Sequence, residues 1–198
     1  PDSSVTWPAI ASGQSPLNPH SEDGTDNLCV LKLNADGEYV WHTFYGTRTG
    51  AASLTIDLSG NIFVSGMSYN SWNGPNGESP LNGNSGGGDI LVIKLDSDGD
   101  YQWHTFYGAG NIDHGSNIAN DSAGNVYLAG YSENSWYGPD GQTPVVETPG
   151  IGTSATILKL DSNGAYQWHA FYGSASHGSS IDINDNGDII FAGSSESS

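Results

Sequence analysis

Positive charge and sulfur are nearly absent from this sequence. Only four of its 198 residues are Lys or Arg, against 22 Asp and Glu, so the formal net charge is −18. Nucleic acid and anionic membrane surfaces would be repelled by such a chain, and we expect neither as a partner. Cys29 is the single cysteine, which excludes a disulfide within the chain and a cysteine-based zinc cluster.

Long apolar runs and helix-forming blocks are missing as well. No stretch approaches the roughly 20 apolar residues that a membrane-spanning helix needs, so membrane insertion is not expected. The sequence shows neither an initiating Met nor a signal peptide, and we expect a processed mature form or an excised fragment. With 28 Gly, 9 Pro and 35% hydrophobic residues, the chain is expected to form turn-rich β-structure around a core.

A repeat of about 64 residues runs through the chain. The three lysines, Lys32, Lys94 and Lys159, are spaced by 62 and 65 residues. The six tryptophans follow the same period in two series, Trp41, Trp103 and Trp168, and Trp7, Trp72 and Trp136. A fixed period of this length is typical of repeat architectures. We therefore expect a single repeat domain over 1–198, divided into 5–70, 71–134 and 135–198.

Each repeat is predicted to hold four short antiparallel strands. In the middle repeat they are "DILVIKL" (89–95), "YQWHTFYG" (101–108), "SNIAND" (116–121) and "NVYLAGYS" (125–132). Apolar and aromatic runs bounded by Gly and Asp are typical of strands, and the short "DSDG" and "DSAG" connections predict tight hairpins. The stretch 73–88 is a long loop rich in Gly, and loops of this length are usually functional or disordered.

Together these strands resemble the seven-bladed β-propeller repeat family, whose units are called SBBP repeats. The resemblance rests on the D-x-x-x-x-K-L strand (89–95), the Trp strand (103–108) and the D-x-x-G-N-x-Y-x-x-G hairpin (121–130), and it covers nearly all of the chain in three copies. It implies propeller blades in an extracellular or surface-associated protein. It implies no activity, because a propeller carries many unrelated functions.

In a propeller blade the 116–121 strand would be innermost, followed outward by 125–132 and by the two strands of the next copy. The chain would then start in the outer half of one blade and end in the inner half of another. Three blades are fewer than the usual 4–8. We expect either part of a larger propeller or a ring completed by self-association, with two chains making six blades. A β-trefoil or prism, which closes with three repeats, is the alternative fold.

Binding is expected on the loop-rich face of the blades, opposite the tight hairpins. Trp7, Trp72 and Trp136 open its long loops, and Asn73 and Tyr137 follow the last two. In one interpretation each Trp stacks on a sugar ring and gives one weak site per blade. In the other, each Trp folds back and pins its own loop over the blade.

Arg48, Asp113, His114 and His177 are the other candidate binding residues on this face. A His–Asp pair can act as acid and base, but no nucleophile, zinc-protease or P-loop motif accompanies these residues. We therefore predict no enzymatic activity.

Acidic residues are expected mainly in the turns. Asp96, Asp98 and Asp100 concentrate oxygen ligands that suit Ca²⁺ in "DSDGD". The same residue types favour tight hairpins, so calcium is a candidate ligand rather than a required cofactor. Each Lys lies in an apolar strand, where we expect a carboxylate or carbonyl partner.

The sequence thus predicts a non-enzymatic extracellular or cell-surface β-propeller module that serves as a scaffold or as an interaction and assembly unit. The expected partners are a second copy, the rest of a longer propeller chain, or surface proteins. The alternative function is multivalent carbohydrate binding through the Trp loops.

Overall fold

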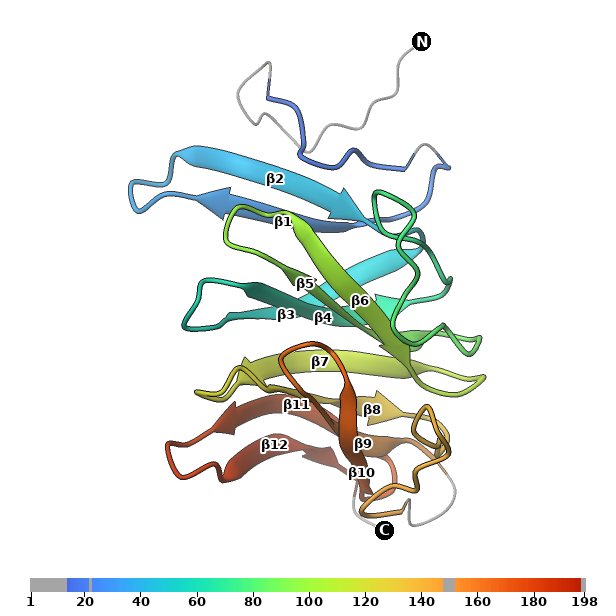
Figure 1. The fold of residues 1–198 in the computed structure, drawn as a ribbon. Helices are drawn as coiled ribbons and strands as arrows, with labels where there is room; N and C mark the ends of the chain where they lie inside the picture. The colour runs from blue at the N-terminus through green and yellow to red at the C-terminus, as the bar shows by residue number, and fades with distance from the viewer. Residues whose placement is uncertain (1–13, 22, 148–151, 197–198) are drawn as a thin grey trace.

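The computed structural model describes residues 14–21, 23–147 and 152–196, so Trp7 lies outside the described residues. The described chain is all-β (Figure 1). Its strands are β1 (Leu28–Leu33), β2 (Tyr39–Tyr45), β3 (Thr49–Ile56), β4 (Ile62–Ser68), β5 (Asp89–Leu95), β6 (Tyr101–Tyr107), β7 (Asp113–Asn120), β8 (Val126–Ser132), β9 (Ser154–Leu160), β10 (Tyr166–Tyr172), β11 (Ser176–Ile183) and β12 (Ile189–Ser195). Within these residues, no helix is long and apolar enough to cross a membrane.

The strands form two complete blades and two half-blades. One four-stranded sheet has the order β3-β4-β5-β6 and the other the order β10-β9-β8-β7, while β1 pairs with β2 and β11 with β12. All pairings are antiparallel. This is the strand order that the sequence predicts, with the first two strands of each blade taken from one copy and the outer two from the next.

The blades stack along the chain from β1–β2 at one end of the molecule to β11–β12 at the other (Figure 1). The inner strands are neighbours, because β7 lies beside both β3 and β11. The innermost strand of the middle repeat is therefore predicted correctly, although it begins at Asp113 rather than at Ser116.

Burial follows the position of each strand within its blade. The apolar strands β5 and β9 are covered on both faces, as are their neighbours β4 and β8. The outer strands β6 and β10 are instead exposed near the hairpin and buried toward the opposite end. The core fills the space between adjacent sheets, where Phe63, Val92, Leu128 and Leu158 belong to one cluster.

The fold class is confirmed as β-propeller blades built from four-stranded antiparallel sheets. The sheets do not close into a ring within the described chain, and the three-fold closure of a trefoil or prism is not the arrangement that the structure has. The repeat bounds given above stay a prediction.

Candidate functional site

The connections between strands divide the molecule into two faces (Figure 1). The hairpin face carries the turns at 34–38, 57–61, 96–100, 121–125, 161–165 and 184–188. The loop face carries the segments at 46–48, 69–88, 108–112, 133–147 and 173–175. Strands of alternating direction produce this separation, as the sequence predicts.

The hairpin face is built from one turn used repeatedly. In the β5–β6 hairpin the Asp96 carboxylate accepts hydrogen bonds from the backbone N–H groups of Asp98 and Asp100, both at 3.0 Å. Gly99 completes the turn with a φ of 88°, a conformation that favours glycine. The other hairpins begin with an Asp or Asn that makes the same contacts: Asn34, Asp57, Asp121, Asp161 and Asn184.

The candidate calcium ligands Asp96, Asp98 and Asp100 lie in this turn. Asp96 Oδ1 is occupied by two backbone donors. In the described part of the chain, no three His, Cys, Asp or Glu side chains form a group that could hold a metal ion. The turn therefore gives the Asp96 carboxylate a structural role, and calcium binding stays a prediction.

The tryptophans of the long loops point inward. The Trp72 ring stacks on the His104 ring with centroids 3.7 Å apart and an interplanar angle of 3°, and Trp136 stacks on His169 at 3.8 Å and 12°. Each imidazole also hydrogen-bonds through Nε2 to the backbone carbonyl of the Trp above it, at 3.0 Å. Trp72 and Trp136 therefore each hold their own loop against the blade.

These contacts determine how the buried imidazoles are protonated. A carbonyl only accepts, so His104 Nε2 carries the hydrogen and its Nδ1 accepts from the Tyr101 hydroxyl at 2.6 Å. Burial lowers the pKa of His104 to about 4, and it raises the pKa of Tyr101 to about 12. The Tyr-x-x-His motif thus forms hydrogen bonds between neutral groups that hold the loop in place. Both ring nitrogens of His104 are engaged in these bonds.

Asn73 and Tyr137 follow the two tryptophans and are both exposed. Asn73 lines a small open pocket of about 230 Å³, together with Trp72, Asn27 and Tyr45. Tyr137 is 69% exposed. Trp72 and Trp136 are stacked on imidazoles, whereas the Tyr137 ring is exposed to solvent.

Asp113 and His114 do not form an acid–base pair. Neighbouring strand residues point to opposite faces, and Asp113 is buried, where its carboxylate accepts a hydrogen bond from Ala109 N–H at 2.8 Å. Burial raises the pKa of Asp113 to about 7. His114 instead stacks on Tyr131 with centroids 5.4 Å apart, and Tyr131 contacts His177 at 4.6 Å. The structure thus joins the two histidines through a tyrosine and separates both from the aspartate.

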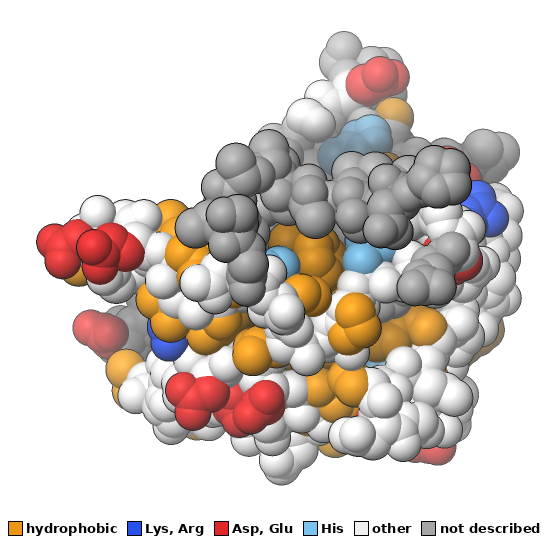
Figure 2. Space-filling view, turned by 90° about the horizontal axis from the view of Figure 1, so that it is seen from above, with side chains coloured by type: hydrophobic (Ala, Val, Ile, Leu, Met, Phe, Trp, Pro, Cys, Tyr) orange, Lys and Arg blue, Asp and Glu red, His pale blue; other side chains and the backbone are white. Residues whose placement is uncertain are grey.

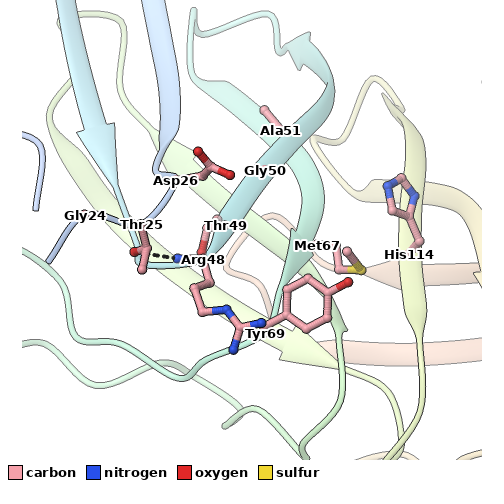
Figure 3. Close-up of a pocket in the computed structure, with 10 residues that line it drawn as sticks. All are labelled: Gly24, Thr25, Asp26, Arg48, Thr49, Gly50, Ala51, Met67, Tyr69 and His114. Carbon is pink, nitrogen blue, oxygen red and sulfur yellow. Dashed lines mark hydrogen bonds between the residues drawn. The ribbon is translucent and has the colours of Figure 1, made fainter. Parts of the chain in front are cut away.

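An open pocket of about 500 Å³ brings Arg48 and His114 to one site on the loop face (Figure 3). The Arg48 guanidinium lies over the Tyr69 ring, 4.9 Å from its centroid. Its backbone N–H donates to Thr25 Oγ1 at 3.2 Å, and Asp26 and Met67 line the same pocket. A stacked guanidinium keeps its N–H groups directed outward, which suits a carboxylate ligand.

The backbone at Arg48 is unusual. Its φ is 49°, a left-handed value that is uncommon for a residue other than glycine, and Ala175 in the third copy has nearly the same φ of 48°. Ile112 and Ala175 occupy the same place in the other copies. In each case the backbone carbonyl accepts a hydrogen bond from the N–H of the residue that follows the second strand of the blade, which is Tyr69, Glu133 or Glu196. Arg48 is also the only arginine in the sequence. The guanidinium in this pocket is therefore particular to the first copy.

Sequence reasoning identified Arg48 and His114 but missed Thr25, Asp26, Met67 and Tyr69 as pocket residues. The signal that finds the pocket is the difference between the copies at the Arg48 position. The missed residues come from the segment before β1 and from β4 and the residue after it, and only the packing around β3 brings them together.

Comparisons with known proteins agree with this architecture. A family model described as SBBP, Beta-propeller repeat, matches residues 102–135, which run from β6 through β8. The chain therefore contains a β-propeller repeat, as its resemblance implies. The match covers part of one copy, and the count of three copies stays a prediction.

A curated relative is the Regulatory protein FlaEY of Caulobacter vibrioides, which is 25% identical over 189 residues. The aligned region is 93% of this chain and 20% of the relative, so the chain spans about a fifth of that protein's length.

Proposed function

We propose that this chain is a non-enzymatic extracellular interaction module whose loop face binds a protein partner at the Arg48 pocket. The observation that carries the proposal is the Arg48 guanidinium over Tyr69, in an open pocket next to Met67. The pocket offers a planar cation beside apolar surface. The matching ligand is a peptide segment that presents a carboxylate next to an apolar side chain.

The charge of the whole chain shapes this binding. With 22 acidic residues against four basic ones, the long-range field opposes an anionic ligand, while Arg48 attracts it at short range. Salt screens the long-range repulsion more than the close contact. Moderate salt is therefore expected to help rather than weaken the interaction.

A peptide-display selection tests the proposal. A random peptide library is panned on the chain in about 0.3 M NaCl, where the Debye length is well below 10 Å, and the selected peptides are titrated against variants. Peptides that bear a carboxylate should lose binding to Arg48→Gln and Tyr69→Ala, and keep binding to the hairpin-face control Asp98→Ala. Peptides that bind both pocket variants unchanged would contradict the proposal.

Carbohydrate binding is less well supported than peptide binding. A sugar platform needs a free aromatic face, whereas the rings of Trp72 and Trp136 are stacked on imidazoles. Among the Phe, Tyr and Trp residues that the structure describes, Tyr137 alone has a mostly exposed ring. A glycan array on the same protein preparation separates the two functions.

An assembly role and a location outside the cell complete the proposal. Strand edges left unpaired in the described residues support association with other propeller repeats. The location follows from the family resemblance and is tested by accessibility of the protein to protease on intact cells.

A further inference from the structure

One position of the inner strands carries an imidazole ring in two copies and no side chain in the first. The residue at this position is Gly50 in β3, His114 in β7 and His177 in β11. In each copy it faces the same position of the following strand, in the pairs Gly50 with Met67, His114 with Tyr131 and His177 with Ser194. A register shift begins one residue later in all three pairs. The three positions are therefore structurally equivalent.

In the second and third copies the imidazole at this position packs on Tyr131. The His114 ring stacks on Tyr131 of its own blade, with centroids 5.4 Å apart and an interplanar angle of 8°. The His177 ring contacts the same tyrosine edge-on, at 4.6 Å and 69°. A ring from the chain itself thus occupies this place in both copies.

In the first copy the same place is a hollow at Gly50. A Cβ placed on Gly50 would meet no atom of the described residues within 4 Å. Gly50 and His114 both line the pocket of about 500 Å³ that holds Arg48 (Figure 3), and ligand pockets commonly have about 300–1,000 Å³. The strand that carries Gly50 belongs to the complete blade β3-β4-β5-β6. The hollow therefore arises because residue 50 has no side chain.

Neither backbone geometry nor crowding requires a glycine at position 50. Its φ is outside the left-handed region, and the described residues leave room for a Cβ. The same register shift forms in the other two copies with a histidine at this position. A glycine inside a strand lowers stability and often marks the close approach of a ligand. What Gly50 provides is space.

The hollow combines an apolar wall with a cation. Met67 lies opposite Gly50, and residues directly opposite in an antiparallel pair share one face of the sheet. Gly88 lies against the same wall, since a Cβ on it would meet the Met67 sulfur at 2.8 Å and the Tyr69 ring at 3.3 Å. A thioether makes favourable contacts with aromatic rings. The Arg48 guanidinium over Tyr69 supplies the charge, two residues from Gly50.

The other polar side chains of the pocket limit the ligand further. Burial lowers the pKa of His114 below its usual value, so its imidazole is neutral at pH 7. Asp26 lines the pocket as well, and its carboxylate disfavours a second anionic group in the ligand. The pocket therefore suits one carboxylate beside an uncharged ring.

The acidic hairpins lie at the far end of the strands from this pocket. Figure 2 looks onto the end of the molecule that carries β1 and β2, and shows acidic side chains gathered at the left edge, where the hairpins lie in Figure 1. Arg48 and Gly50 are at the loop-face end of β3. A ligand with a single carboxylate can therefore reach Arg48 without passing the acidic hairpins.

We infer that the pocket binds a peptide segment in which an aromatic residue stands next to an acidic residue. The ring enters the hollow at Gly50 and packs against Met67, as His114 packs on Tyr131 in the next blade. The carboxylate accepts hydrogen bonds from the Arg48 guanidinium. Because the pocket is open, the peptide continues on both sides of the ring. This inference rests on the proposed function and names the side chain that accompanies the carboxylate.

The experiment uses peptides selected on the wild-type chain, which should carry Phe, Tyr or Trp beside Asp or Glu. They are synthesised with amidated C-termini, so that the carboxylate comes from a side chain, and titrated by fluorescence anisotropy. Gly50→His supplies the imidazole that the other copies have at this position, and it should weaken binding about tenfold to a hundredfold. The matched control Gly50→Ala adds one methyl group and should keep the affinity within about twofold.

A double-mutant cycle between peptide and pocket measures the contribution of the ring. Replacing the aromatic residue of the peptide by Ala should weaken binding to the wild-type chain by about the same factor as Gly50→His does. The same replacement should cause little further loss on Gly50→His, because the hollow is already filled. The peptide change leaves the protein unaltered, so it tests the ring independently of folding. Gly50→His itself should keep the far-UV spectrum and the melting temperature of the wild type.

The ring site and the proposed function fail separately. Peptides that depend on Arg48 but carry no aromatic residue would overturn the ring site and leave the interaction module standing. Aromatic peptides that bind Gly50→His as tightly as the wild type, or a cycle in which the two losses simply add, would have the same meaning. A selection in which no peptide depends on Arg48 would overturn both.

Discussion

The Asn117 side-chain nitrogen donates a hydrogen bond to the Ser53 hydroxyl, 3.0 Å away and 64 positions earlier in the chain. The oxygen of the same amide accepts from the Ile181 backbone N–H, also at 3.0 Å and 64 positions later. One side chain therefore ties together the inner strands of three successive blades. Contact between blades thus depends on specific polar bonds as well as on apolar packing.

Asn117→Ala should lower the free energy of unfolding by about 1–3 kcal/mol, because Ser53 and the Ile181 N–H both lose a partner. Urea denaturation measures the change. Asn163→Ala is the control, since Asn163 is exposed, and its effect should stay within about 0.5 kcal/mol. An equal decrease in unfolding free energy in the two variants would show that the hydrogen bonds of Asn117 do not stabilise the fold more than an exposed side chain does.

Trp136→Ala should be strongly destabilising. The ring is buried, stacks on His169 and donates to Ser132 Oγ at 3.1 Å, and loss of such a side chain costs about 3–5 kcal/mol. Tyr137→Ala, next in sequence and mostly exposed, should change stability by less than about 0.5 kcal/mol. Thermal melting compares them, and a Trp136→Ala protein as stable as the wild type would contradict the pinning role.

Asp113→Asn should change how stability depends on pH. The folded-state pKa of Asp113 is raised from 3.8 to about 7 by burial, so the folded protein binds this proton more tightly than the unfolded chain does. The stability from the protonated carboxyl is present below pH 3.8 and is lost as the pH rises to about 7. Since one pKa unit is about 1.4 kcal/mol, the expected effect is a few kcal/mol.

The measurement is the difference in unfolding free energy between the Asn variant and the wild type, taken from pH 4 to pH 8. This difference should move in favour of the variant as the pH rises and become constant above about pH 7. Using the difference removes the contributions of His104 and His169, which are common to both proteins. A difference that is flat across this range would mean that Asp113 is ionised throughout.

Chelation should leave the melting temperature unchanged. The Asp96 carboxylate already accepts two backbone hydrogen bonds in its hairpin, which stabilise the turn without a metal. Differential scanning calorimetry with EDTA, and again with added CaCl₂, makes the comparison. A lower melting temperature in EDTA that CaCl₂ restores would assign calcium to the hairpin face, and Asp98→Asn would then locate it.

Local signals in the sequence were sufficient for the blade. The strand 89–95 is found as predicted because an apolar run between Gly and Asp has few alternatives, and the hairpins follow from an Asp-to-Gly turn that needs only its own backbone. The sequence predicted the chemical class of the lysine partners, a carboxylate or a carbonyl, because a buried ammonium requires an acceptor. That the acceptors of Lys32 and Lys94 are carbonyls in the next blade depends on packing between copies.

The candidate site was only partly predictable. The sequence predicted that the inner strand begins at Ser116 and left Asp113 and His114 in the preceding loop. That both belong to β7, where neighbouring side chains point to opposite faces, is shown only by the structure. The direction of the Trp72 ring was left open by the sequence, because both an exposed and a pinned tryptophan fit the same loop. The His104 imidazole beneath it, from a strand 32 positions away, decides between them.

By itself the sequence determined the repeat, its strands, its turns and the face on which the copies differ, because these depend on residues close together in the chain. Only the tertiary structure decided that Arg48 lies over Tyr69 in a pocket that His114 also lines, and that Asn117 joins the inner strands of three blades. Both facts depend on how separate blades pack, and packing brings together residues whose distance in sequence gives no sign of their contact.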